Sequence, residues 1–137
     1  MNVELFVVCE AATDQQGKIN ILGTFDSIQG GALPVVHPHC AVAVRLRFLK
    51  SEEGEHLIKI NIIDEDGKPV VPPFETKGNV RFGDIPRTSI AVNIILNLQG
   101  LKFASFGEYA VDLSVDGRHA SSLPLTVSKL PEQKQQI

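Results

Sequence analysis

Apolar residues recur at every second position along several stretches of this chain, and this period of two constrains its fold more than any other feature. The longest case runs from Ile90 to Leu98, where every even position is apolar. From Ala41 to Leu49 the even positions are again apolar, and two odd positions carry arginine. Successive side chains of a β-strand point to opposite faces of the sheet, so a period of two indicates a strand with one buried face. The pattern predicts an all-β protein in which Ile90–Leu98 is a central core strand.

Two of these stretches are expected to pair as a first hairpin. The isoleucines of His56–Asp64 have the same parity as the apolar residues of Ala41–Leu49, and the residues between the two stretches are polar. A hairpin through this polar turn would set Phe48 opposite Ile58 and keep one continuous core face.

A second hairpin is expected near the C-terminus. Tyr109–Asp116 alternates cleanly, and Gly117 then ends the stretch. A short loop would fold Ser121–Ser128 back, with Val111 near Leu123. Because proline cannot donate a hydrogen bond to a sheet, the proline in this last strand favours an edge position.

About seven to eight strands with turn signals between them favour an antiparallel β-sandwich, with a partly closed β-barrel as the alternative. Residues 1–130 are expected to form a single domain, since no linker or repeat interrupts them. Residues 131–137 have no apolar period and are expected to form a disordered polar tail.

Size and charge exclude several classes of protein. The chain has 137 residues, 43% of them hydrophobic, which is enough for a core without disulfides or metals. Its net charge of −3 offers no basic field for nucleic acid or an anionic membrane. There is no apolar run of the roughly 18 to 20 residues that a membrane span needs, and no signal peptide. We expect a cytoplasmic protein whose two cysteines are reduced.

Catalytic motifs are lacking in the sequence. We find no nucleophile elbow, no glycine-rich phosphate loop and no Cys-x-x-Cys pair, so neither an enzymatic activity nor a cofactor is expected.

The one segment that could hold a metal is His37-Pro38-His39-Cys40. Imidazole and thiolate are both zinc ligands, so His37, His39 and Cys40 form a candidate zinc site. If consecutive strands reverse direction, the turn Asp64-Glu65-Asp66 lies at the same end of the sandwich, and its carboxylates could complete the site. The alternative is that Cys40 is a small buried side chain at the start of a strand.

The C-terminal third contains Phe103, then Gly107-Glu108-Tyr109, then residues 111–117 and 123–127 around an Asp-Gly turn. Together with Ile21–Phe25, these residues resemble a family of small uncharacterised bacterial proteins with an immunoglobulin-like β-sandwich, a domain of unknown function. The resemblance implies that fold and a bacterial origin, and it implies no activity. Tyr109 also resembles a tyrosine corner, in which the hydroxyl ties a loop to nearby backbone.

Two hypotheses of function follow. In the first, the chain is a non-catalytic protein-interaction or structural module, which presents loops or an edge strand to an unknown protein partner or to another copy of itself. In the second, it is a small-ligand or metal-binding domain that uses the loop His37–Cys40. Replacing His37 and His39 by alanine would separate the two hypotheses.

Overall fold

The computed structural model describes residues 1–131. Residues 132–137, and with them nearly all of the predicted polar tail, lie outside the described part. The described chain forms nine strands and one short 3-10 helix: β1 (Asn2–Gln15), β2 (Lys18–Thr24), β3 (Ser27–Gly30), β4 (Val35–Leu49), η1 (Lys50–Glu52), β5 (Gly54–Ile63), β6 (Phe74–Val80), β7 (Ser89–Phe103), β8 (Gly107–Val115) and β9 (Arg118–Lys129). Within this range there is no helix long and apolar enough to cross a membrane.

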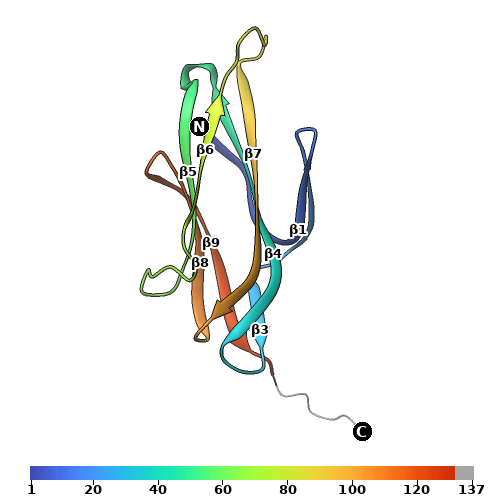
Figure 1. The fold of residues 1–137 in the computed structure, drawn as a ribbon, viewed down its shortest axis with the longest axis vertical. Helices are drawn as coiled ribbons and strands as arrows, with labels where there is room; N and C mark the ends of the chain where they lie inside the picture. The colour runs from blue at the N-terminus through green and yellow to red at the C-terminus, as the bar shows by residue number, and fades with distance from the viewer. Residues whose placement is uncertain (132–137) are drawn as a thin grey trace.

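The strands form two sheets that pack face to face, as Figure 1 shows. The first sheet has the order β2-β1-β4-β7, and the second has the order β3-β9-β8-β5-β6. The predicted β-sandwich is confirmed. One detail differs from the expected antiparallel arrangement, because β3 pairs with β9 in parallel.

The core lies between the two sheets, and the side chains that fill it follow the period of two. Alternate residues of β4, β5 and β8 are buried against one another: Val42, Val44, Leu46, Phe48, Ile58, Ile60, Ile62, Val111, Leu113 and Val115. On these three strands the faces that the sequence predicted to be buried are therefore buried.

The first predicted hairpin is wrong. β4 belongs to the first sheet and β5 to the second, so Phe48 and Ile58 contribute to the core from opposite sheets and do not pair side by side. Between them the chain makes the η1 turn, where the Glu52 carboxylate accepts a hydrogen bond from the Leu49 backbone N–H at 2.9 Å. This turn carries the chain from one sheet to the other.

The C-terminal hairpin is confirmed down to its register, with Val111 opposite Leu123. The expectation that its last strand is an edge is only partly right. Pro124 has no neighbour beyond β8, but from Thr126 to Lys129 the strand also pairs with β3. The proline lies just before that second ladder begins, where its missing N–H costs no hydrogen bond.

Tyr109 has the structural role that the sequence predicted. Its hydroxyl donates to the backbone carbonyl of Ser105 at 2.7 Å, and its ring packs edge-on against Phe103 with centroids 4.9 Å apart. The hydroxyl thus ties the loop between β7 and β8 to the start of β8.

The β1–β2 hairpin covers the outer face of the first sheet. β1 pairs with β4 as far as Cys9 and continues with β2 alone. At the hairpin tip, the Gly17 carbonyl accepts hydrogen bonds from Arg45 at 3.3 Å and from Asn93 at 3.1 Å. Ala41 and Ala43 point to this outer face, yet neither is exposed to solvent. β4 is therefore covered on both faces.

Candidate interaction edge

β7 is an edge strand of the first sheet, and the prediction of a central core strand is wrong. It pairs with β4 from Ser89 opposite Leu49 to Phe103 opposite Val35, except at Gly100, and within residues 1–131 no strand pairs with its other side. Over the 13 residues from Ser89 to Leu101 it carries neither a charged residue nor a proline. Edge strands usually carry such residues, because they prevent pairing with other chains.

The free side of β7 presents a regular set of backbone groups. Lys50, just beyond β4, donates its N–H to the Thr88 carbonyl at 3.2 Å, and these two residues lie on the register of the β4–β7 ladder. Hydrogen-bonded and non-hydrogen-bonded pairs alternate in an antiparallel ladder, so the even residues of β7 bond to β4. The odd residues point their N–H and C=O groups away from β4: Ala91, Asn93, Ile95, Asn97 and Gln99.

The core-facing side chains of β7 are only partly buried: Ile90, Val92, Ile94, Leu96 and Leu98 pack against the core cluster and also reach solvent. β6, in the opposite sheet, approaches from the inner side. Val92 Cγ1 lies 3.6 Å from the position that a Cβ on Gly78 would take. That contact uses the inner face and leaves the backbone groups of the edge free.

The other edges of the two sheets are short or charged. β6 carries Glu75 and Lys77, and Lys77 bonds to Glu55 on β5 at 3.2 Å. β2 begins with Lys18, and its Gly23 adopts a positive φ of 67°. β3 has only 4 residues. In the described chain, β7 is therefore the long edge without these protective features.

The candidate metal ligands do not converge. His39 is exposed, Cys40 is 1% exposed within the core, and the ring of His37 packs at a tilt against Phe25 with centroids 5.3 Å apart. Burial raises the pKa of the Cys40 thiol to about 11, which opposes the thiolate that zinc requires. No group of three or more His, Cys, Asp or Glu side chains within residues 1–131 is arranged to hold a metal.

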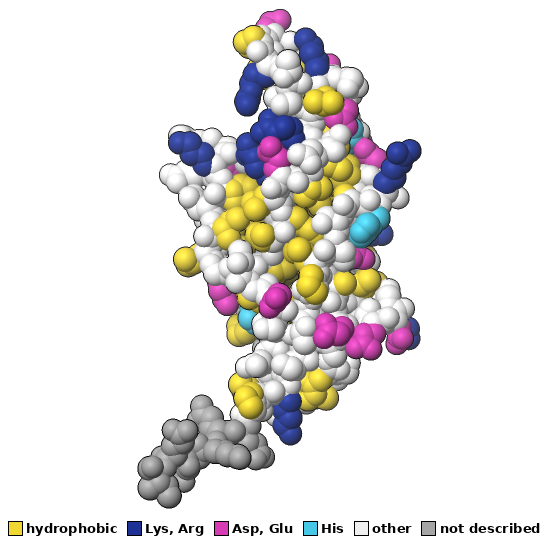
Figure 2. All heavy atoms as spheres, turned by 180° about the vertical axis from the view of Figure 1, so that it is seen from behind, with side chains coloured by type: hydrophobic (Ala, Val, Ile, Leu, Met, Phe, Trp, Pro, Cys, Tyr) yellow, Lys and Arg dark blue, Asp and Glu magenta, His cyan; other side chains and the backbone are white. Residues whose placement is uncertain are grey.

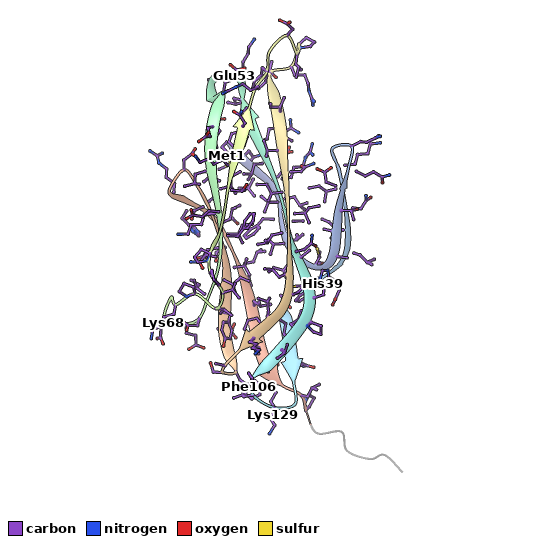
Figure 3. The ribbon with its side chains drawn as sticks, in the orientation of Figure 1. Met1, His39, Glu53, Lys68, Phe106 and Lys129 are labelled. Atoms are coloured by element: carbon purple, nitrogen blue, oxygen red, sulfur yellow. The ribbon has the colours of Figure 1, made fainter. Side chains whose placement is uncertain are left out.

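The acidic turn expected to complete that site stabilises its own loop. Asp64 Oδ1 accepts the backbone N–H groups of Asp66 and Lys68, both at 2.9 Å, and Glu65 accepts the N–H of Glu108. Figure 3 shows Lys68 and His39 on opposite sides of the molecule. The zinc site thus gains no carboxylate from this turn.

Sequence reasoning missed an ion pair around His56. Its Nδ1 lies 2.6 Å from Asp116 Oδ2, its Nε2 lies 2.6 Å from the Glu52 carbonyl, and its ring stacks on Phe48. Burial opposes the charge, yet these two acceptors raise the pKa of His56, and the hydrogen bond from His56 lowers the pKa of Asp116. The available signal was parity, since His56 occupies a core-facing position of its strand.

This ion pair is part of a charged cluster at one end of the sandwich. Glu52 also binds the Met1 amino group at 2.8 Å, and Glu53 accepts the Phe82 backbone N–H at 2.7 Å. Figure 3 shows Met1 and Glu53 toward this end. Each of these carboxylates holds one segment of backbone against another.

A shallow hollow of about 400 Å³ lies on the opposite side of the fold from the β7 edge, between β1 and β9. Its lining is mostly apolar and includes Val7, Phe25, Leu123 and Pro124. Figure 2 shows hydrophobic side chains gathered in the middle of the rear face.

Comparisons with known proteins identify a family. No curated protein and no solved structure was found to match the chain. The model of one family, DUF6941, a family of unknown function, matches residues 4–128. That range runs from β1 nearly to the end of β9 and so includes both sheets and the β7 edge. The chain therefore belongs to the DUF6941 family, whose function is unknown.

Proposed function

We propose that this protein is a non-catalytic protein-interaction module that binds an extended strand along the free edge of β7. The observation that carries the proposal is the 13-residue run without charge or proline on an edge strand whose backbone groups have no partner on one side. An edge of this kind accepts a partner strand through backbone hydrogen bonds, and alternate side chains add specificity.

The energetics favour an added strand. The edge-facing backbone groups of the odd residues from Ala91 to Gln99 would exchange water for hydrogen bonds of about 1 kcal/mol net each. The partly exposed core-facing side chains, such as Ile94 and Leu96, would lose their remaining contact with water, and each square ångström of apolar surface buried contributes about 25 cal/mol. An added strand would thus cover the apolar side chains at this edge of the core.

The groups with shifted pKa values support a non-catalytic role. Hydrogen bonds from Arg47 lower the pKa of Glu4, which joins β1 to β4, and His56 and Asp116 join β5 to the β8–β9 turn. Catalytic groups would be expected to point into a pocket, ready to meet a substrate. Glu52 and Asp116 do border a hollow of about 540 Å³. The Glu52 carboxylate, however, already accepts from Met1 and Leu49, and that of Asp116 from His56 and Leu57, so these groups connect segments of the chain.

A substitution that blocks the edge without disturbing the fold tests the proposal. Asn97 is exposed, and its N–H points away from β4, so Asn97→Pro removes an edge donor and leaves the β4 ladder intact. Asn97→Thr is the matched control, because threonine keeps the N–H and suits a strand. In urea unfolding, the free energy of unfolding of both variants should lie within about 1 kcal/mol of the wild-type value.

The measurement is quantitative affinity capture from the cells of origin, with the two variants compared by mass spectrometry. We expect the threonine variant to capture partner proteins, which include tagged copies of this chain. The proline variant should not capture them. Equal retention by both variants would contradict the proposal that β7 is the binding element.

The alternative function, a metal site at His37–Cys40, has one observation in its favour. His37 Nε2 is buried and has no hydrogen-bond partner among the described residues. Native mass spectrometry with added zinc tests this alternative, because a bound zinc that disappears in His37→Ala/His39→Ala would support it. Zinc that binds the double variant equally well would exclude it.

A further inference from the structure

We infer that the strand bound by β7 is β7 of a second copy of this chain, paired antiparallel about a two-fold axis at Ile95. This inference rests on the proposed function. The two first sheets, of four strands each, would then join into one sheet of eight strands. An isologous pairing uses the same edge of both copies, so it closes at two copies.

The backbone of β7 permits this pairing along its whole central part. The odd residues of β7 point their N–H and C=O groups to the free edge, and an antiparallel partner must present groups of the same kind. With Ile95 opposite Ile95 of the second copy, Asn93 faces Asn97 and Ala91 faces Gln99. Every edge-facing residue from Ala91 to Gln99 therefore meets another edge-facing residue.

The side chains on the outer face select this register. With Ile95 on the axis, each isoleucine meets an isoleucine, and Asn93 meets Asn97. A shift of the axis to Ile94 or Leu96 would set Ile95 against an asparagine. Asn93 already binds Arg45 and Gly17, but its amide keeps one N–H and one acceptor site for the asparagine of the other copy.

The core-facing side chains agree with the same register. Ile94 would lie opposite Leu96 of the second copy, and Val92 opposite Leu98. These are non-hydrogen-bonded pairs, in which the side chains approach most closely. All four residues are partly exposed in the single chain, so each copy would cover the apolar margin of the other.

Electrostatics favour a second copy over an unrelated strand. Each chain has a net charge of −3, which opposes association at long range, but β7 contributes nothing to that charge between Ser89 and Leu101. A foreign strand is commonly selected by complementary charges, and this edge offers none. Its neutral, self-matching sequence is suited to a strand identical to itself.

Cysteine cross-linking tests both the partner and the register. In the inferred pair the two Cα atoms at position 95 are about 5.5 Å apart, within the roughly 4.4 to 6.8 Å that a disulfide spans. Ile95→Cys should therefore form a disulfide-linked dimer under mild oxidation. The native Cys9 and Cys40 are buried and do not compete.

The matched control is Asn97→Cys on the same face of the strand. In this register position 97 of one copy is four residues from position 97 of the other, about 13 Å along the strand, so this variant alone should stay monomeric on a denaturing gel. Mixing Asn93→Cys protein with Asn97→Cys protein should restore a cross-linked dimer. Efficient cross-linking of Asn97→Cys alone would overturn the inferred register.

Native mass spectrometry separates this inference from the function on which it rests. A wild-type dimer that becomes monomeric in Asn97→Pro, but not in Asn97→Thr, supports the inference. A wild-type monomer at all concentrations, together with a different protein that only the threonine variant captures, overturns the second copy and leaves the proposed function standing. A dimer that persists in Asn97→Pro contradicts the inference, because it would use another surface.

Discussion

β4 and β7 pair along nearly their whole length, have 15 residues each and alternate in the same way, yet their surroundings differ. Val42, Val44 and Leu46 of β4 are 0% exposed, whereas Val92, Ile94 and Leu96 beside them reach solvent. β4 has a strand on each side and the β1–β2 hairpin over its outer face. The difference shows that β7 carries more apolar surface than one copy of the fold covers.

Thiol accessibility should give the largest contrast between the two strands. Cys40 on β4 is buried, and burial raises the pKa of its thiol to about 11, so it should react only when the chain opens. A thiol introduced by Asn97→Cys on β7 should react at least about 1,000-fold faster in dilute protein. Labelling with a chromogenic disulfide reagent measures both rates, and comparable rates would contradict the sealed position of β4.

Truncation of core side chains should give the next largest contrast. Leu46→Ala on β4 should lower the free energy of unfolding by about 3 kcal/mol, because it leaves a cavity in a closed core. Ile94→Ala on β7 should lower the free energy of unfolding of the monomer by about half as much, since water already reaches that side chain. Urea unfolding of dilute protein measures both values. Equal losses would mean that β7 is as well covered as β4.

Removing the charges of β6 should make that edge behave more like β7. In Glu75→Thr/Lys77→Thr the strand loses both of its charged residues, so we expect self-association to strengthen by about tenfold and larger oligomers to appear. Sedimentation velocity over a range of concentrations measures this effect. Lys59→Thr is the control, because β5 already has a strand on each side. If the double variant associates no more strongly than the wild type, charge is not what distinguishes the β6 edge from the β7 edge.

The smallest effect concerns the charged cluster, which lies away from the β7 edge. The pKa of His56 is raised from 6.5, so its pairing with Asp116 stabilises the fold fully below that value and weakens as the pH rises through the raised pKa. The pKa of Asp116 is lowered from 3.8, so the contribution is also lost in strong acid.

His56→Gln should therefore cost on the order of 1 kcal/mol near pH 5.5 and less at pH 8.5. Denaturant unfolding at the two pH values measures the difference, with dimerisation followed in parallel as the control. A cost that grows toward pH 8.5 would contradict a charged His56. A change in dimerisation would contradict its independence from β7.

The sequence predicted well what depends on neighbouring residues. Alternation identified the buried faces of β4, β5 and β8. The short Asp116-Gly117 turn requires the strands on its two sides, Tyr109–Asp116 and Ser121–Ser128, to pair as a hairpin. These predictions succeeded because strand parity and tight turns are local properties.

What the sequence did not reveal depends on the path between strands. The segment at Lys50–Glu52 was predicted to be part of a hairpin turn, but it crosses the roughly 10 Å between packed sheets. The parity of the flanking strands is the same whether the chain turns back within one sheet or crosses to the other. For the same reason the uninterrupted alternation of Ile90–Leu98 could not distinguish a central strand from an edge strand.

The candidate zinc site met a related geometric limit. His37 and His39 lie two residues apart on β4, whereas Cys40 has the opposite parity and faces the core. Val35 has the parity of His37 and is also buried in the core, so the alternation of β4 shifts between Val35 and Cys40, beside Pro38. Pro38 alone did not reveal how this shift would separate the exposed His39 from the buried Cys40.

The parallel pairing of β3 with β9 also sets an order for folding. Ser27–Gly30 is synthesised early, but its only sheet partner is Thr126–Lys129, roughly a hundred residues later. During synthesis on the ribosome, β3 and its Ile28 therefore have no strand to pair with until nearly all of residues 1–131 have been made. Completion of β9 is then the step that joins the first-made and last-made parts of the chain, and a nascent chain halted before it would expose β3 to chaperones and proteases.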